Sequence, residues 1–195
     1  MHQLGRALVK ALYYIRHGET EDIASGIKSR PDTPLTTKGV KQATKAGEAL
    51  VSRGIQPSLI VCSEFLRARQ SADAVALAVG YNLATIQVQP LLNERHYGEA
   101  EGMPMEELEQ RWPGGIDLPP NAETFPALQQ RAFAAVQWLM QLQPDIVVVV
   151  GHGTLGRAII RAVTGTPYTD EYRPGRLALE TGQVISLFPQ FATEF

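Results

Sequence analysis

Residues 11–20 read ALYYIRHGET, and this stretch decides the fold. A run of β-prone residues at 11–15 stops abruptly at a cation, an imidazole and a glycine. It predicts a strand with His17 just beyond its carboxyl end. The stretch IVVVVGHG at 146–153 has no polar alternation, which predicts a central strand covered on both faces, with His152 at its end.

A third apolar run, residues 58–62, leads through Ser63 into a segment with the pattern of a helix. The first turn of this helix would bring Arg67 to the same edge of the sheet. In open α/β sheets ligands bind outside the carboxyl ends of the strands, so these groups can meet although they lie far apart in sequence. Arginine binds phosphate through a planar fork of donors, and a nearby helix start adds backbone N–H groups. We therefore expect a phosphate site.

Such a site can support nucleophilic catalysis. A neutral imidazole is a competent nucleophile toward phosphorus, and a covalent intermediate divides hydrolysis into two easier steps. The leaving alkoxide needs a proton, and Glu94 is the best candidate for the acid because its polar stretch, 93–98, follows the strand-like run 85–88. Glu99 and Glu101 lie close by, and any of these carboxylates can instead be a solvated surface group.

The motifs resemble those of the histidine phosphatase superfamily, also called phosphoglycerate mutase-like, over nearly the whole chain. The Arg-His-Gly-Glu-Thr signature matches residues 16–20, and further segments match 32–36, 66–72 and 151–153 in the same order. Four motifs in order are far more specific than one. Strand and helix alternate along the chain, and the expected fold is an α/β three-layer sandwich, with a mostly parallel mixed sheet and helices on both faces.

The resemblance also implies roles for individual residues. His17 would be the phosphorylated nucleophile and Glu94 the proton donor, while the phosphoryl group would be held by arginine and histidine side chains. The implied catalytic group is Arg16, His17, Arg67, Glu94 and His152. The implied substrate contacts are Arg16, Thr20, Arg67, Arg95, Tyr97, His152 and Gly153. Neither a metal nor a cofactor is implied.

Each of these residues also has a purely structural interpretation. His17 can be a strand-end histidine satisfied by a backbone carbonyl, and His152 can belong to a tight turn into a helix. Arg67 can lie on a solvated helix face because Arg69 lies nearby, although the two positions point in different directions on a helix. Arg95 and Tyr97 can be a solvated loop residue and a packing aromatic.

Several positions depart from the family pattern. Ile23 stands where many members have an asparagine that contacts phosphate, and Lys28-Ser29 replaces a common Gln-Gly. Residues 122–124 read Ala-Glu-Thr in place of Gly-Glu-Ser. Lys28 or Arg30 can take over a substrate contact.

Residues 93–98 resemble cofactor-dependent phosphoglycerate mutases, but those enzymes carry a much longer insertion afterwards, with an adjacent pair of arginines. This chain has only residues 102–121 there, and no such pair. A short cover excludes water poorly, which favours hydrolysis. We predict metal-independent hydrolysis of a small phosphorylated metabolite through phosphohistidine. The alternatives are a phosphoglycerate mutase and a noncatalytic phosphate-binding protein.

The irregular segment 98–121 is interrupted by prolines and glycines and predicts a cap over the site. Within it, Trp112 and Arg111 either shape the substrate's other half or anchor the loop. The remaining expected elements are helices at 36–53, ended by Gly54, and at 65–79, 123–142 and 155–163, and a closing hairpin of 177–180 with 183–188.

Composition narrows the function classes. The chain has 195 residues, 44% of them hydrophobic, and a formal net charge of −2, so we expect a single domain, 1–195, that binds neither nucleic acid nor a membrane. The lone Cys62 is expected to pack as a small hydrophobic residue. No signal sequence and no run of ~18 apolar residues is seen, which predicts a cytoplasmic protein. The expected partner, a small-molecule phosphomonoester, follows from the resemblance and the phosphate-site motifs. A homodimer stays open.

Overall fold

The computed structural model describes residues 9–113, 118–165 and 179–188. Its sheet has the strand order β3-β2-β4-β1-β5. The strands are β1 (Ala11–Arg16), β2 (Leu59–Cys62), β3 (Gln87–Val88), β4 (Ile146–Gly151) and β5 (Val184–Phe188). The first four pair in parallel, and β5 runs antiparallel beside β1. The predicted mixed sheet is confirmed.

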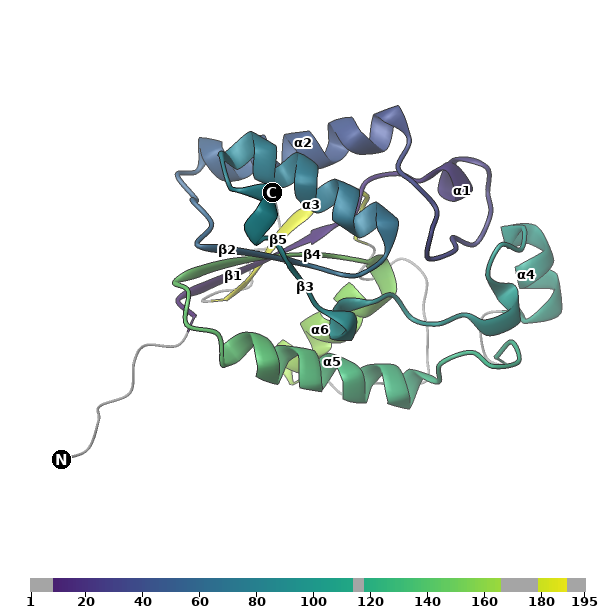
Figure 1. Ribbon diagram of the computed structural model, residues 1–195. Coiled ribbons are helices and arrows are strands. Elements are labelled where there is room, and N and C mark those ends of the chain that lie inside the picture. The colour runs from purple at the N-terminus through teal and green to yellow at the C-terminus, as the bar shows by residue number, and fades with distance from the viewer. Residues whose placement is uncertain (1–8, 114–117, 166–178, 189–195) are drawn as a thin grey trace.

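Helices cover both faces of this sheet (Figure 1). The helices are α1 (Glu21–Ala24), α2 (Thr37–Ser52), α3 (Leu66–Val79), α4 (Met105–Arg111), α5 (Phe125–Met140) and α6 (Gly153–Thr164). Short 3₁₀ turns lie at Leu83–Thr85, Pro90–Leu92 and Gly98–Ala100. Helices α2 and α3 lie on one face and α5 and α6 on the other, which confirms the three-layer sandwich.

Local sequence signals explain where the helices begin and end. The hydroxyl of Thr36 accepts a hydrogen bond from the Gly39 amide at 3.0 Å and so caps α2. The helix gives way to Gly54, which has a φ of 69° that favours glycine. Thr124 caps α5 in the same manner, accepting from the Ala127 amide at 3.3 Å.

The core is divided by the sheet into two hydrophobic clusters. On one face, Tyr14 and Val149 pack with residues of α5 and α6, among them Leu155. On the other face, Ile15 and Val148 pack with residues of α2 and α3. The valines of β4 are fully buried, as expected for a central strand covered on both sides.

Only part of the expected closing hairpin, 177–180 with 183–188, lies among the described residues: residues 181 and 182 form a turn, and β5 is the second strand. Residues 177 and 178 lie outside the described part of the chain, while Leu179 and Glu180 are not in a strand. Strand β5 pairs with β1, where Ile185 lies opposite Tyr14. The second run of the expected hairpin thus joins the central sheet as an antiparallel strand. The Leu179 carbonyl accepts a hydrogen bond from Arg16.

Two segments far apart in sequence join beyond the carboxyl ends of the parallel strands, where Figure 1 shows α1 and α4. The Lys28 amide donates to the Met103 carbonyl, and the Gly102 amide donates to the Lys28 carbonyl, each at 2.8 Å. The Met105 amide donates to the Gly26 carbonyl, also at 2.8 Å. These bonds hold the loop after α1 against the start of α4.

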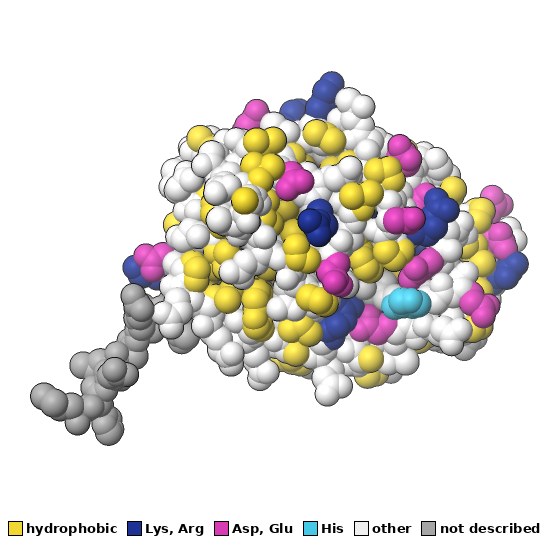
Figure 2. Space-filling view, in the orientation of Figure 1, with side chains coloured by type: hydrophobic (Ala, Val, Ile, Leu, Met, Phe, Trp, Pro, Cys, Tyr) yellow, Lys and Arg dark blue, Asp and Glu magenta, His cyan; other side chains and the backbone are white. Residues whose placement is uncertain are grey.

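The surface in the orientation of Figure 1 carries both signs of charge. Figure 2 shows acidic and basic side chains interspersed over the side that holds α4, and more hydrophobic side chains toward the opposite side. None of the helices in the described part of the chain combines the length and the apolar character that crossing a membrane requires.

Candidate active site

His17 directly follows β1, and its backbone amide donates to the Gly151 carbonyl at 2.9 Å, at the end of β4. The ring is buried, and its Nδ1 lies 2.7 Å from the Gly18 carbonyl oxygen. A carbonyl only accepts, so Nδ1 carries the proton and Nε2 keeps its lone pair. That lone pair accepts a hydrogen bond from Nε of Arg67 at 3.3 Å.

The surroundings of His17 keep its ring neutral. Burial, followed by the charges of Arg67 and Arg16, lowers the pKa of His17 to about 3. At neutral pH the imidazole is therefore a nucleophile with a free electron pair. The carbonyl contact foreseen in the structural interpretation is present, and it leaves Nε2 available rather than consuming the ring.

His152 precedes α6, and its ring centroid lies 5.1 Å from that of His17. Its Nε2 is 2.8 Å from the Ser63 hydroxyl, which donates to Oδ1 of Asn93 at 2.8 Å. Because the Ser63 proton is directed at Asn93, Nε2 of His152 must be the donor to Ser63. Burial, followed by the charge of Arg67, holds the pKa of His152 well below its usual range.

Two arginines complete the base of the site. Arg67 lies in the first turn of α3, is 2% exposed, and donates to the Arg30 carbonyl at 2.6 Å. Arg16 ends β1 and donates to the Leu179 carbonyl. In contrast, Arg69 on the same helix as Arg67 is exposed. The expected difference between these two helix positions is confirmed.

Several buried polar nitrogens have no hydrogen-bond partner in the described part of the chain. They include Nε of Arg16, Nη2 of Arg95 and Nδ1 of His152. Buried polar groups without partners are rare in folded proteins, since each costs free energy. Two of the three belong to guanidinium groups, so an anionic ligand would satisfy them.

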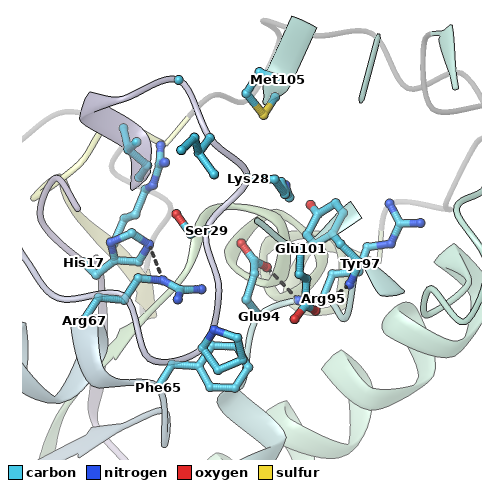
Figure 3. Close-up of a pocket in the computed structure, with 15 residues that line it drawn as sticks. His17, Lys28, Ser29, Phe65, Arg67, Glu94, Arg95, Tyr97, Glu101 and Met105 are labelled. Carbon is cyan, nitrogen blue, oxygen red and sulfur yellow. Dashed lines mark hydrogen bonds between the residues drawn. The ribbon is translucent and has the colours of Figure 1, made fainter. Parts of the chain in front are cut away.

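Glu94 approaches the site from the opposite wall. Its carboxylate accepts from the backbone amides of Arg95 and Leu155 at 2.9 Å and of Thr154 at 3.0 Å. Burial favours the protonated acid, but the charge of Lys28 and these three N–H groups outweigh it and lower the pKa of Glu94. Figure 3 shows the carboxylate directed into the cavity, across from His17.

The cavity has a volume of about 250 Å³. Its polar lining residues include Arg16, His17 and Arg67, and Figure 3 shows His17 and Arg67 side by side. The apolar residues are Ile23, Ile27, Pro31, Phe65 and Met105. Phe65 lies beside Arg67, with its ring centroid 5.0 Å from the guanidinium, and Figure 3 shows Met105 on the other side of the cavity. The site thus combines cationic groups with apolar lining residues on more than one side.

Arg95 and Tyr97 line the opposite side of the cavity. Arg95 is 5% exposed, so it is not the solvated loop residue of the structural interpretation. Its guanidinium lies 4.0 Å from the Phe125 ring centroid and 5.0 Å from that of Tyr97. The Tyr97 hydroxyl bonds to that of Thr154 at 2.7 Å, and the Lys28 ammonium lies 3.1 Å from the Tyr97 ring centroid.

Other sequence candidates lie elsewhere. Thr20 caps α1 by accepting from the Ile23 amide at 3.1 Å, and it is not among the residues that line the cavity. Gly153 begins α6, where an added Cβ would lie 3.4 Å from the Arg16 guanidinium. Arg30 pairs with Asp22 at 2.9 Å, whereas Lys28 lines the cavity.

Two further expectations concern Trp112 and Cys62. Trp112 is half-buried and does not line the cavity. Cys62 is buried, as predicted, and burial raises the pKa of its thiol to about 11. Within residues 9–113, 118–165 and 179–188, no three His, Cys, Asp or Glu side chains gather as metal ligands would.

One residue that sequence reasoning missed is Arg131. It donates to the carbonyls of Leu91 at 3.0 Å and Asn93 at 2.6 Å, and pairs with Glu123 at 2.7 Å. It thereby holds the segment that carries Glu94. A charge beside the apolar stripe of α5 was the available signal.

Known proteins share this arrangement of sequence and fold. The family model of the histidine phosphatase superfamily (branch 1) matches residues 12–186. The chain is 31% identical over 157 residues to "Uncharacterized phosphatase PhoE" of Bacillus subtilis (strain 168), covering 80% of this chain and 78% of that protein. It is 30% identical over 178 residues to the 2,3-bisphosphoglycerate-dependent phosphoglycerate mutase of Bartonella quintana (strain Toulouse), covering 83% of each.

Solved structures agree. A mycobacterial glucosyl-3-phosphoglycerate phosphatase in complex with VO3 matches with a TM-score of 0.78 and 26% identity, covering 91% of this chain and 92% of that one.

Proposed function

The chain belongs to the histidine phosphatase superfamily, and we propose that it hydrolyses small phosphomonoesters through a phosphohistidine at His17, without a metal ion. One observation carries the proposal: Nε2 of neutral His17 is unprotonated and lies beside buried Arg67, with the Glu94 carboxylate across the cavity. A relative named as a phosphatase and a neighbour named as a phosphatase support hydrolysis.

In the first half of the proposed reaction, Nε2 of His17 attacks phosphorus and the bond from phosphorus to the ester oxygen breaks. Protonated Glu94 gives its proton to the leaving oxygen. The guanidinium of Arg67, which bonds to Nε2 in the free site, turns its donors to the phosphoryl oxygens. Arg16 adds further contacts to these oxygens. Because Nε2–H of His152 already donates to Ser63, His152 contacts a phosphoryl oxygen only after Nδ1 takes up a proton in the bound state.

In the second half, a water molecule attacks the phosphorus of phosphohistidine. Glu94, now a carboxylate, accepts a proton from this water, and the P–N bond breaks to regenerate neutral His17. Inorganic phosphate leaves. Glu94 has regained the proton that it donated in the first half.

We propose that residues 1–195 form a single domain and that residues 98–121 within it cap the active site. Glu101 and Met105 from this segment line the cavity. The leaving group of the substrate would then lie between Met105 and the side that holds Lys28 and Tyr97. A cytoplasmic location and a homodimer are kept as proposals, the latter to be tested by light scattering.

Release of inorganic phosphate from a panel of phosphomonoesters, in the presence of EDTA, tests the proposed activity. Turnover by the wild-type protein that vanishes in His17→Ala is the expected result. Turnover that EDTA abolishes, or that survives in His17→Ala, would contradict it.

The mutase is the second candidate because the Bartonella relative bears that name. It predicts interconversion of phosphoglycerates with a bisphosphoglycerate primer and little hydrolysis. A noncatalytic phosphate-binding protein predicts neither reaction, but protection against thermal unfolding by phosphate or vanadate.

A further inference from the structure

The Tyr14 hydroxyl bonds to both backbone polar groups of His152. The His152 amide donates to this hydroxyl at 2.6 Å, and the hydroxyl donates to the His152 carbonyl at 2.8 Å. Tyr14 is completely buried. A side chain from one strand thus fixes the peptide geometry at the end of the neighbouring strand.

The surrounding chain leaves space for this ring at two glycines. A Cβ on Gly151 would overlap the Tyr14 hydroxyl, and a Cβ on Gly156 would lie 2.7 Å from Cε1 of the ring. Real Cβ atoms essentially never approach so closely. The last residue of β4 and the first turn of α6 are therefore both shaped around Tyr14.

The Tyr14 hydroxyl supplies the acceptor that the backbone amide of His152 needs at the start of α6. His152 lies between β4 and α6, where the first amides of a helix have no partner within the helix. Burial, followed by the charge of Glu94, raises the pKa of Tyr14. The hydroxyl therefore keeps its proton and can donate and accept at the same time.

The bond also connects the two histidines of the site. Tyr14 lies on β1, the strand that leads into His17, and it pairs in register with Val149 of β4. By bonding to His152 it fixes the end of β4 to the strand that carries the nucleophile. A shift of His152 would change the 5.1 Å separation of the two imidazole centroids.

We propose that Tyr14 is a positioning residue, whose hydroxyl fixes the backbone of His152 and so holds its ring beside His17 at the phosphoryl site. The functional part of this inference rests on the proposed phosphatase activity. The structural part, the orientation of the His152 ring, does not.

Tyr14→Phe removes the hydroxyl and keeps the ring, and Tyr13→Phe is the matched control on the opposite face of the same strand. The chain has four histidines, so ¹⁵N-histidine labelling resolves the His152 imidazole by NMR. Tyr14→Phe should shift or broaden this resonance and weaken orthovanadate binding by about tenfold, since a buried amide loses its acceptor. Tyr13→Phe should leave both within experimental error.

An unchanged His152 resonance, or unchanged vanadate affinity in a protein whose wild type binds vanadate, would overturn the proposal. If the wild-type protein neither binds vanadate nor hydrolyses any ester, the proposed function fails, and the resonance alone decides the role of Tyr14. Should Tyr14→Phe not fold, Gly156→Ala displaces the ring while keeping the hydroxyl. The same two measurements then apply with the same criteria.

Discussion

Nε of Arg67 donates to Nε2 of His17 at 3.3 Å, so a buried cation occupies the electron pair of the nucleophile in the free site. A phosphoryl group that enters the site must separate the two. The guanidinium then gains oxygen acceptors, and Nε2 becomes free to attack. In the free site this contact gives the Arg67 guanidinium an acceptor, and the charge of Arg67 helps to keep the His17 imidazole neutral.

Removing the Arg67 guanidinium should therefore abolish most transition-state stabilisation. Arg67→Ala is expected to lower kcat/KM for p-nitrophenyl phosphate by roughly 10²–10³-fold, as for loss of an oxyanion donor. The matched control is Arg69→Ala, which removes an exposed arginine on the same helix and should change kcat/KM little. Comparable losses in the two variants would argue against a specific role for Arg67.

The leaving-group dependence tests Glu94. Glu94→Gln should slow hydrolysis of alkyl phosphates by roughly 10²–10⁴-fold and that of p-nitrophenyl phosphate much less, because nitrophenolate leaves without a proton. Glu99→Gln, an exposed carboxylate nearby, serves as the control. Equal losses for both classes of ester would refute the assignment of Glu94 as the acid.

Lys28 should set the pH range of the reaction. Its charge lowers the pKa of Glu94, and Glu94 must be protonated to act as an acid. Activity is thus expected to fall as pH rises through this pKa. Lys28→Met should move the fall to higher pH, whereas Lys38→Met, which removes an exposed lysine, should leave the profile unchanged. A profile that moves to lower pH in Lys28→Met would contradict the electrostatic role.

The neutral state of His17 should also appear in the stability of the protein. An unfolded histidine titrates near pH 6.5, but the pKa of folded His17 is about 3. Between these values the unfolded state binds more protons, so the free energy of unfolding should decrease as pH falls from 6.5.

Substitution of this residue isolates its contribution. His17→Gln should reduce the pH slope by up to about 1.4 kcal/mol per pH unit in urea titrations. An identical slope in wild type and His17→Gln would show that His17 is not buried in the neutral form.

Much of this site could be predicted from sequence because its main groups stand at strand ends. His17, Arg67 and His152 follow or closely trail apolar runs, and parallel strands deliver their carboxyl ends to a common edge. The mixed sheet and the layers followed from the same runs. The sequence predicted β5 as a strand but did not identify β1 as its neighbour, since alternation alone does not identify the neighbouring strand.

Other contacts join segments that are distant in the sequence, and the residues around them give little indication of the contact. Tyr14 looks like an ordinary strand residue until β4 brings His152 to its hydroxyl. Arg131 looks like a helix surface charge until the segment before Glu94 folds over it. The neutral tautomer of His152 likewise requires the contact between Ser63 and Asn93, which lie 30 positions apart.

Trapping the intermediate tests the account most directly. Rapid acid-free quenching during turnover of a phosphomonoester, followed by mass spectrometry of peptides at alkaline pH, should find a phosphoryl group on His17. The adduct should be absent from His17→Ala, which should also release no phosphate. Steady turnover with no phosphohistidine in wild type, together with undiminished turnover in His17→Ala, would contradict the central claim.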